Sequence, residues 1–86
     1  MNFKDLKNGD SLLINNKTYE VLYVQEEADV LPDLDKIRKF LAVYLHNENS
    51  KSLESTATLW IYSDDEIIFV ERGKKIKIFK EDISLK

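Results

Sequence analysis

His46 is the only histidine of the chain, and imidazole is the side chain whose unperturbed pKa lies closest to neutral pH. It is therefore the first candidate for a general acid or base, and a hydrolase that uses His46 with nearby acids is the enzyme alternative. His46 ends an apolar run and precedes Asn47, which is typical of a partly exposed strand end. We interpret it as a structural residue and predict a protein without catalytic residues.

Other residue patterns that perform chemistry are equally sparse. The serines lie outside any Gly-x-Ser-x-Gly turn, and Asp64, Asp65 and Glu66 are consecutive, whereas calcium loops place their ligands at alternate positions. The chain has two glycines and no cysteine, so it lacks a glycine-rich phosphate loop and a thiolate zinc site. We predict no cofactor and no metal, and we interpret the three acids as a charged hairpin tip.

Aromatic and basic residues of the C-terminal half form the remaining candidate site. Trp60, Tyr62 and Phe69 share one face of a predicted hairpin. Tyr44 and Phe40 have matching parity on the preceding strand. Two lysines alternate with Ile76 and Ile78, so they project from the same face if the isoleucines are buried. Exposed aromatics beside cations bind peptides, partner proteins or nucleic-acid bases. The predicted binding residues are Tyr44, Trp60, Tyr62, Phe69, Lys75 and Lys77.

Each part of this candidate site has a structural alternative. The aromatic residues are also explained as a second small core, which loops or a chain terminus cover. Lysines on the outward face of a terminal strand also discourage edge-to-edge association. The solvent exposure of Trp60, Tyr62 and Tyr44 separates these interpretations.

Two tight turns near the C-terminus determine which side chains share a face. Residues 56–62 and 66–70 predict a hairpin, and a two-residue turn at Asp64-Asp65 sets Leu59 opposite Val70 and Trp60 opposite Phe69. The predicted core face then holds Leu59, Ile61, Ile68 and Val70. A three-residue loop at 71–73, with Gly73 left-handed, sets Ile76 opposite Ile68; a Gly73-Lys74 turn would instead bring charge into the core.

The N-terminal part predicts another hairpin, over residues 10–25, with a two-residue turn at Asn15-Asn16. The turn places four apolar residues on one side, whereas Leu22 and Val24 fall on the other. The four are Leu12, Ile14, Tyr19 and Val21. A strongly bent strand, or a bulge near Val21 or Leu22, resolves this conflict.

The middle and the end of the chain are less regular. Residues 25–35 are acidic and contain the only proline, which predicts a connection across the surface. Residues 36–46 fit a helix capped by Asp33 or a strand, and we favour the strand because its neighbours are strands. Residues 81–86 are short and polar, and we expect partial order there, with Ile83 and Leu85 over an open end of the fold.

These elements predict an all-β fold, with α+β as the alternative if residues 36–46 are helical. We expect a small SH3-like antiparallel barrel or roll of five to six strands, because one flat sheet would expose an apolar face. The run Gly9-Asp10, Tyr19-x-Val21, Leu41-x-x-Tyr44-Leu45 and Leu59-Trp60-Ile61 resembles uncharacterised small β domains of bacteria and archaea. The resemblance covers most of the chain and implies a barrel-like fold with no assigned activity.

Composition restricts the class of protein further. The 86 residues are 43% hydrophobic and 34% charged, which suits a single globular domain over residues 1–86. The absence of cysteine fits a reducing compartment, and the longest apolar run, residues 40–45, is too short to span a bilayer. We therefore expect a cytoplasmic protein without a signal peptide or a membrane anchor.

The leading functional hypothesis is a non-catalytic module that binds a protein or a peptide through the aromatic surface or by strand addition at an exposed edge. Homodimerisation through that surface is a variant. The alternative is nucleic-acid binding by the basic edge at residues 74–80 with base stacking on the strand aromatics, which the net charge of −3 disfavours. Steep salt dependence distinguishes the alternative.

Overall fold

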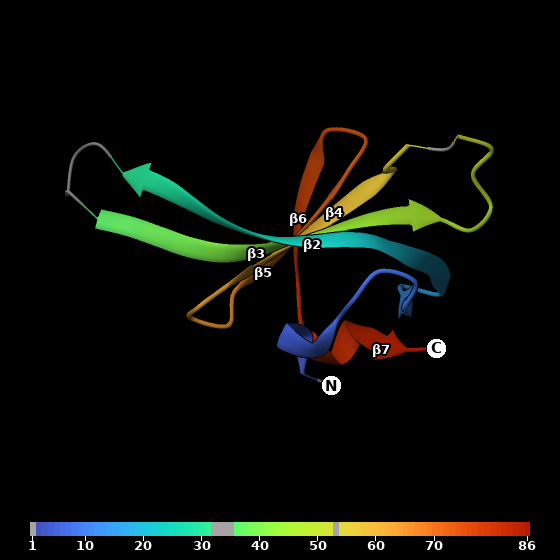
Figure 1. Ribbon diagram of the computed structural model, residues 1–86, viewed down its shortest axis with the longest axis horizontal. Coiled ribbons are helices and arrows are strands. Elements are labelled where there is room, and N and C mark those ends of the chain that lie inside the picture. Colours follow the sequence, from blue (N-terminus) through green and yellow to red (C-terminus); the bar gives the residue numbers. More distant parts are fainter. Residues whose placement is uncertain (1, 32–35, 53) are drawn as a thin grey trace.

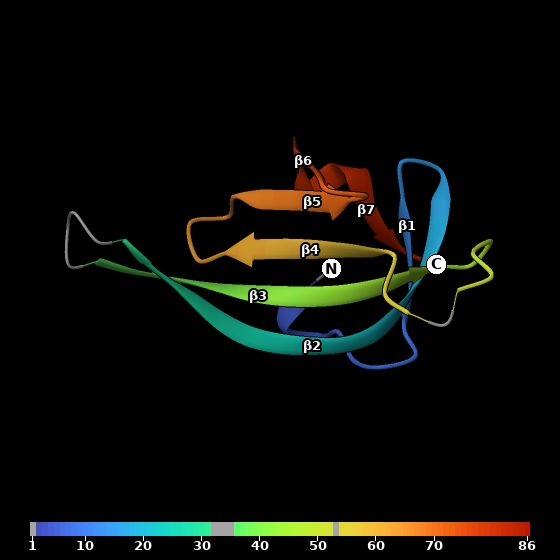
Figure 2. The same cartoon turned by 90° about the horizontal axis from the view of Figure 1, so that it is seen from above.

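The computed structural model describes residues 2–31, 36–52 and 54–86, and these residues form an all-β fold. Seven antiparallel strands form one sheet in the order β6-β5-β4-β3-β2-β1-β7, where five to six strands were predicted. The sheet curls into a half-barrel, and β2 with β3 extends from it as a long ribbon (Figure 1, Figure 2). The elements are η1 (Phe3–Asp5), β1 (Ser11–Ile14), β2 (Lys17–Leu31), β3 (Lys36–Asn47), β4 (Ala57–Tyr62), β5 (Ile67–Glu71), β6 (Lys74–Ile78), η2 (Lys80–Asp82) and β7 (Ile83–Leu85).

The first hairpin forms as predicted. Asn15 and Asn16 both have positive φ, 50° and 67°, and Ile14 pairs with Lys17 across a two-residue turn. The register between β2 and β3 shifts between Val21 and Tyr23, which confirms the predicted bulge. The extra residue returns Val24 to the side of Val21, where it packs against the main core.

The middle of the chain confirms one prediction and corrects another. Residues 36–47 form strand β3, so the strand was the right choice and the helix was wrong; Asp33 lies outside the described residues. The acidic residues 25–31, predicted as a connection, instead continue β2. They pair with β3 along its whole first half, from Gln25 with Ala42 to Leu31 with Lys36. Backbone pairing with β3 therefore overrides the low strand propensity of these acids.

The hairpin of β4 and β5 has a register one residue away from the prediction. Asp65 adopts φ 67° and the Tyr62 N–H donates to the Glu66 carbonyl at 2.9 Å, so the loop has three residues. Leu59 therefore pairs with Phe69, and Trp60 with Ile68. Because a one-residue slip exchanges the two faces of a strand, Ile67 and Phe69 replace Ile68 and Val70 in the core.

The turn between β5 and β6 also differs from the predicted three-residue loop. Arg72 and Gly73 both have positive φ, 52° and 77°, and form a two-residue turn that pairs Glu71 with Lys74. Ile76 consequently lies opposite Phe69 and not opposite Ile68. The side chains of β6 alternate in the predicted sense, with Ile76 and Ile78 toward the core side and the lysines between them on the other side.

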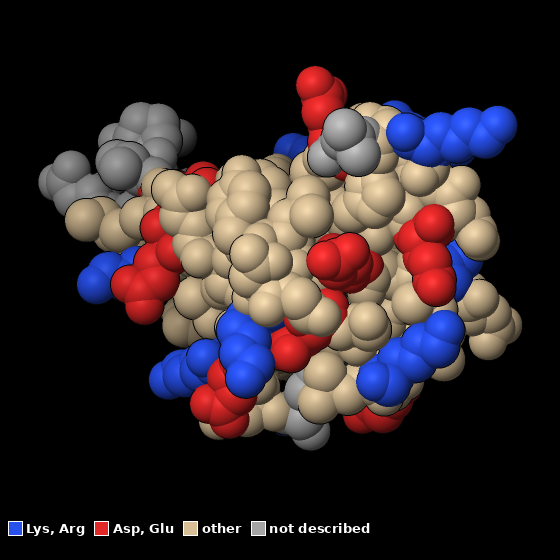
Figure 3. All heavy atoms as spheres, turned by 45° about the vertical axis from the view of Figure 1, so that its right-hand side comes forward, with Lys and Arg blue, Asp and Glu red and all other residues tan. Residues whose placement is uncertain are grey.

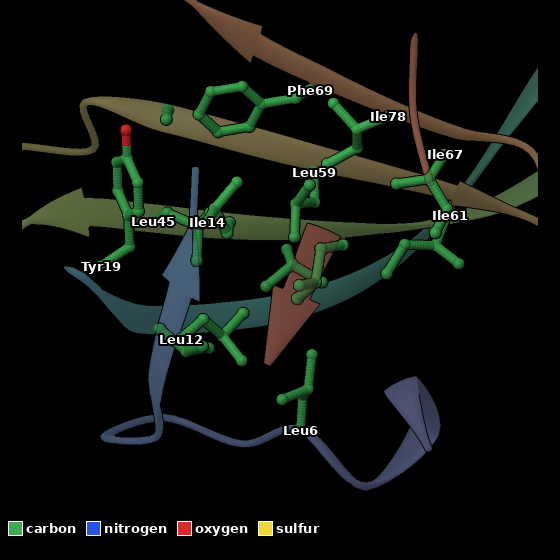
Figure 4. Close-up of a cluster of buried hydrophobic side chains, with 14 residues drawn as sticks. Leu6, Leu12, Ile14, Tyr19, Leu45, Leu59, Ile61, Ile67, Phe69 and Ile78 are labelled. Carbon is green, nitrogen blue, oxygen red and sulfur yellow. The ribbon is translucent and has the colours of Figure 1, made fainter. Parts of the chain in front are cut away.

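The main core fills the inside of the curl, which we call the inner face. The rings of Tyr19 and Phe69 pack edge to face with their centroids 5.7 Å apart, and the Tyr19 hydroxyl donates a 2.6 Å hydrogen bond to Glu71. These contacts join β2 to β5 across the sheet. Burial, followed by Glu71, raises the pKa of Tyr19. Figure 4 shows the inward side chains converging above Leu6 of the N-terminal segment. The buried cluster is Leu6, Leu12, Ile14, Tyr19, Val21, Val43, Leu45, Ala57, Leu59, Ile61, Ile67, Phe69, Ile78 and Ile83.

The C-terminal residues are more ordered than expected. Residues 83–85 form β7, which pairs with β1 through Ile14 and Ile83, and Ile83 is buried whereas Leu85 is exposed. β7 is the strand that raises the count to seven. No helical segment in the described part of the chain combines the length and the apolar character needed to cross a lipid bilayer.

Candidate functional site

A second apolar cluster covers the opposite side of the sheet, which we call the outer face. Phe40 and Tyr62 pack ring against ring at 5.0 Å, and Phe40 lies 5.7 Å from Trp60. Three residues of the cluster are buried and three are partly exposed, so part of it forms a core and part meets solvent. The cluster consists of Phe40, Ala42 and Tyr62, with Tyr44, Trp60 and Ile68 packed against them.

The β2 end of the outer face carries a pair of tyrosines. Tyr23, half exposed, stacks on Tyr44 with ring centroids 4.4 Å apart. The Tyr44 hydroxyl donates to Glu27 at 2.8 Å, and this hydrogen bond, followed by burial, raises the pKa of Tyr44. Neutral Tyr44 therefore holds the Glu27 carboxylate in place on the outer face.

Arg38 covers the ring of Tyr62 at the other end of the cluster. Its guanidinium lies 3.7 Å from the ring centroid and forms ion pairs with Asp64 at 3.2 Å and Glu66 at 3.3 Å. The Glu66 backbone N–H and then Arg38 hold the pKa of Asp64 below its ordinary value. These contacts tie the long ribbon to the tip of the β4–β5 hairpin.

The β6 end of the outer face combines an aromatic ring with lysines. The Lys75 ammonium lies 4.8 Å from the centroid of the Trp60 ring, which is partly exposed. Lys77 pairs with Ile68 on the same face, and both lysines are exposed. β6 is the last strand of the sheet on this side, and in the described residues it pairs with β5 alone. This end therefore presents a free strand edge beside an apolar surface.

The structure brings together five of the six predicted binding residues. Tyr44, Trp60, Tyr62, Lys75 and Lys77 share the outer face, although Tyr62 is 6% exposed and is part of the buried cluster. Phe69 was wrongly placed on this face: it belongs to the main core, because the three-residue loop shifts its register. Of the predicted residues on this face, Tyr44 and Trp60 are partly exposed and the two lysines are exposed.

A groove on the inner side was missed by the sequence interpretation. It has a volume of about 980 Å³ and an apolar floor of Phe3, Val24, Leu41 and Ile61. Charged side chains of both signs surround it, among them Lys39 and Glu26. The residues come from the N-terminal segment with η1, from β2, β3 and β4, from the loop between β4 and β5, and from η2, so no local sequence pattern indicates the groove.

The residues with reactive side chains make structural contacts. The His46 imidazole contacts the Ser52 carbonyl, and Ser55 donates to the carbonyls of Leu45 and Ala57. Asp64 and Asp65 lie at the exposed hairpin tip as predicted. Within residues 2–31, 36–52 and 54–86, His, Asp and Glu side chains form no group of three that would suit a metal ion.

Comparison with known proteins and the surface charge complete the description of the site. No protein-family model, curated protein or solved structure matches the chain. On the face in Figure 3, acidic and basic side chains are interspersed around uncharged surface. That face therefore lacks the single-sign field that attracts a polyanion.

Proposed function

We propose that the protein is a non-catalytic interaction module that accepts an extended acidic peptide segment as an added strand along β6. The observation that supports this most is the free β6 edge, whose residues Lys74 to Lys77 are all exposed in an otherwise well-packed sheet. Natural proteins pair, cover or charge such edges, and β6 is charged. A charged edge repels copies of itself and attracts a strand of opposite charge.

The backbone of β6 supports strand addition. In an antiparallel ladder, successive residues direct their N–H and C=O groups alternately to one side and the other. Glu71 and Lys74 flank the two-residue turn and face each other, so Lys75 and Lys77 direct these groups out of the sheet. An added strand would pair with these two residues, and its main-chain hydrogen bonds would supply affinity.

The side chains beside this edge indicate the sequence of the added strand. On the outer face it would lie beside Lys75 and Lys77, where acidic residues pair favourably across strands. On the inner face it would lie beside Ile76, which is 48% exposed and offers an apolar contact. The preferred ligand therefore alternates acidic and apolar residues.

The covered aromatic rings favour a peptide over nucleic acid. Base stacking needs an open ring face, but Lys75 lies over Trp60 and Arg38 lies over Tyr62. The cations of residues 74–80 also divide between the two faces, since Lys74 follows the inner parity. We also retain the SH3-like barrel as the proposed architectural class, supported by the curl of the sheet around one core.

Titration of the single tryptophan tests the proposal. We expect a peptide that alternates glutamate and valine to change the fluorescence of Trp60, and a peptide that alternates lysine and valine to leave it unchanged. Lys75→Glu/Lys77→Glu should abolish the response to the acidic peptide. Lys17→Glu/Lys51→Glu carries the same net charge on exposed residues outside β6, in β2 and in the loop after β3, and should retain it.

Two outcomes contradict the proposal. Equal loss of peptide binding in both double variants would show general charge attraction without a site at β6. The protein could also bind a single-stranded oligonucleotide more tightly than the acidic peptide. If Lys75→Glu/Lys77→Glu then abolished oligonucleotide binding, the edge would be assigned to nucleic acid.

A further inference from the structure

Besides the outer edge of β7, which among the described residues pairs with β1 alone, the sheet has a free edge on the part of β2 that extends beyond β1. β1 pairs with β2 from Lys17 to Glu20. Beyond it, the Gly9 N–H donates to the Val21 carbonyl, and the Val21 N–H donates to the Asp10 carbonyl. Among the described residues, the rest of β2 pairs with β3 alone. Figure 2 shows β2 along the rim of the curled sheet opposite β5 and β6. The molecule therefore carries free edges on both rims.

The free edges of β6 and β2 carry opposite charge. β6 has the sequence Lys74-Lys75-Ile76-Lys77, and the free part of β2 has Glu26-Glu27-Ala28-Asp29. Each cation of the first segment has an acid at the corresponding position of the second, and the isoleucine corresponds to the alanine. Glu26, Ala28 and Asp29 are exposed, and Glu27 is half-buried beside Tyr44.

Strand direction and face agree with this correspondence. Four antiparallel steps separate β6 from β2, so the two strands run in the same direction within one molecule. Two copies placed rim to rim, with their outer faces on the same side, therefore bring β6 beside β2 in a parallel pair. Lys75 then neighbours Glu27 and Lys77 neighbours Asp29 on the outer face, while Lys74 neighbours Glu26 on the inner face.

The backbone groups are also in phase. The Tyr62–Glu66 hydrogen bond fixes which residue pairs of β4 and β5 are hydrogen-bonded, and the strand registers carry this alternation through β3 to β2. In this part of β2 the odd-numbered residues are therefore hydrogen-bonded to β3. Glu26 and Ala28 direct their N–H and C=O groups away from β3, out of the sheet. In a parallel ladder, the N–H and C=O groups of one residue bond to the two residues that flank its neighbour on the other strand. Lys75, which neighbours Glu27, would bond in this way to Glu26 and Ala28.

We propose that the acidic segment accepted by β6 is the free edge of β2 of a second copy of this chain, an inference that rests on the proposed function of β6. Pairing of β6 with β6, or of β2 with β2, places like charges together and is disfavoured. The β6–β2 contact uses different surfaces on the two copies, so it leaves one free edge of each kind. The copies therefore form a closed ring or an open chain rather than an isolated pair.

Complementary charge reversal tests this assembly. Lys74→Glu/Lys77→Glu alters β6, and Glu26→Lys/Asp29→Lys alters β2 without removing Glu27, which Tyr44 holds. By sedimentation velocity at low salt, we expect wild type to associate with rising concentration and each variant alone to be weakened by roughly tenfold or more in Kd. An equimolar mixture of the two variants should associate again, because reversed β6 meets reversed β2.

Control variants and stability measurements identify specific effects. Lys17→Glu/Lys51→Glu and Glu48→Lys/Glu54→Lys change the net charge equally at exposed positions outside both edge segments and should associate as wild type does. Circular dichroism and urea midpoints show whether each variant folds. A monomeric wild type, or a mixture of the two altered variants that stays monomeric, overturns the inference. If that monomer still binds the glutamate–valine peptide through Lys75 and Lys77, the proposed function of β6 stands and only the identity of its partner is wrong.

Discussion

Truncation of Phe69 tests the register of the β4–β5 hairpin, on which the division between the two faces depends. Phe69 is 5% exposed and meets Tyr19 edge to face, whereas its neighbours Ile68 and Val70 lie on the outer face and are partly exposed. The alternative register, with Leu59 opposite Val70, exchanges these roles. The two registers therefore predict opposite orders of destabilisation for alanine substitutions at the three positions.

The expected magnitudes follow from burial. Removal of a buried phenylalanine costs about 3 to 5 kcal/mol of unfolding free energy. Loss of the Tyr19 contact contributes about 0.5 to 1.5 kcal/mol of that loss. A domain of 86 residues has a total of roughly 4 to 13 kcal/mol, so Phe69→Ala removes a large part of it. Val70→Ala removes less apolar surface at a wetter position and should cost about 1 kcal/mol.

Urea denaturation followed by circular dichroism measures these differences, provided that the m-values agree between variants. We expect the order Phe69→Ala, then Ile68→Ala, then Val70→Ala, from most to least destabilised. Failure of Phe69→Ala to fold, while Val70→Ala folds, supports the same order. A loss of stability in Val70→Ala as large as that in Phe69→Ala would refute the assigned register.

Three further predictions concern single contacts. The pKa of Tyr19 is raised, so folding favours its neutral form. The wild-type free energy of unfolding should therefore fall as pH rises above about 10, by up to about 1.4 kcal/mol per pH unit for this group. Urea denaturation over the same pH range should show a smaller loss of stability in Tyr19→Phe. Arg38→Ala removes the contacts that tie the ribbon to the β4–β5 tip, and hydrogen exchange of backbone amides in residues 37–40 should accelerate; unchanged exchange would show that these contacts do not hold the ribbon. Gly73→Ala should lower the free energy of unfolding by about 1 kcal/mol, measured by urea denaturation, because a side chain is strained at a φ of 77°. An unchanged free energy of unfolding would mean that the turn adopts another type.

Local sequence patterns predicted much of the framework. Asn15-Asn16 marked a turn with positive φ, the change of parity after Val21 required a bulge, and the apolar run at residues 40–45 indicated a strand. Each of these features depends on residues close together in the chain. Most of the predicted outer-face residues were therefore placed correctly, and they include Trp60 and the two lysines of β6.

The remaining features depended on contacts between distant residues. The loop at Asp64 and Asp65 accommodates two or three residues, and the choice decides whether Phe69 or Val70 enters the core. The position of Tyr19 across the sheet favours the choice that buries Phe69. The acidic residues after Gln25 likewise form a strand only because β3 supplies a partner for their backbone.

The sequence by itself determined the tight turns and an outer row of aromatic and basic side chains, and it favoured an all-β chain. These properties follow from residue type and from the two-residue period of a strand, which act locally. Only the tertiary structure decided the strand register, the groove lined by Val24 and the position of the two oppositely charged edges of β6 and β2 on opposite rims. Those properties arise from packing and backbone pairing across the sheet, to which residues far apart in the chain contribute jointly.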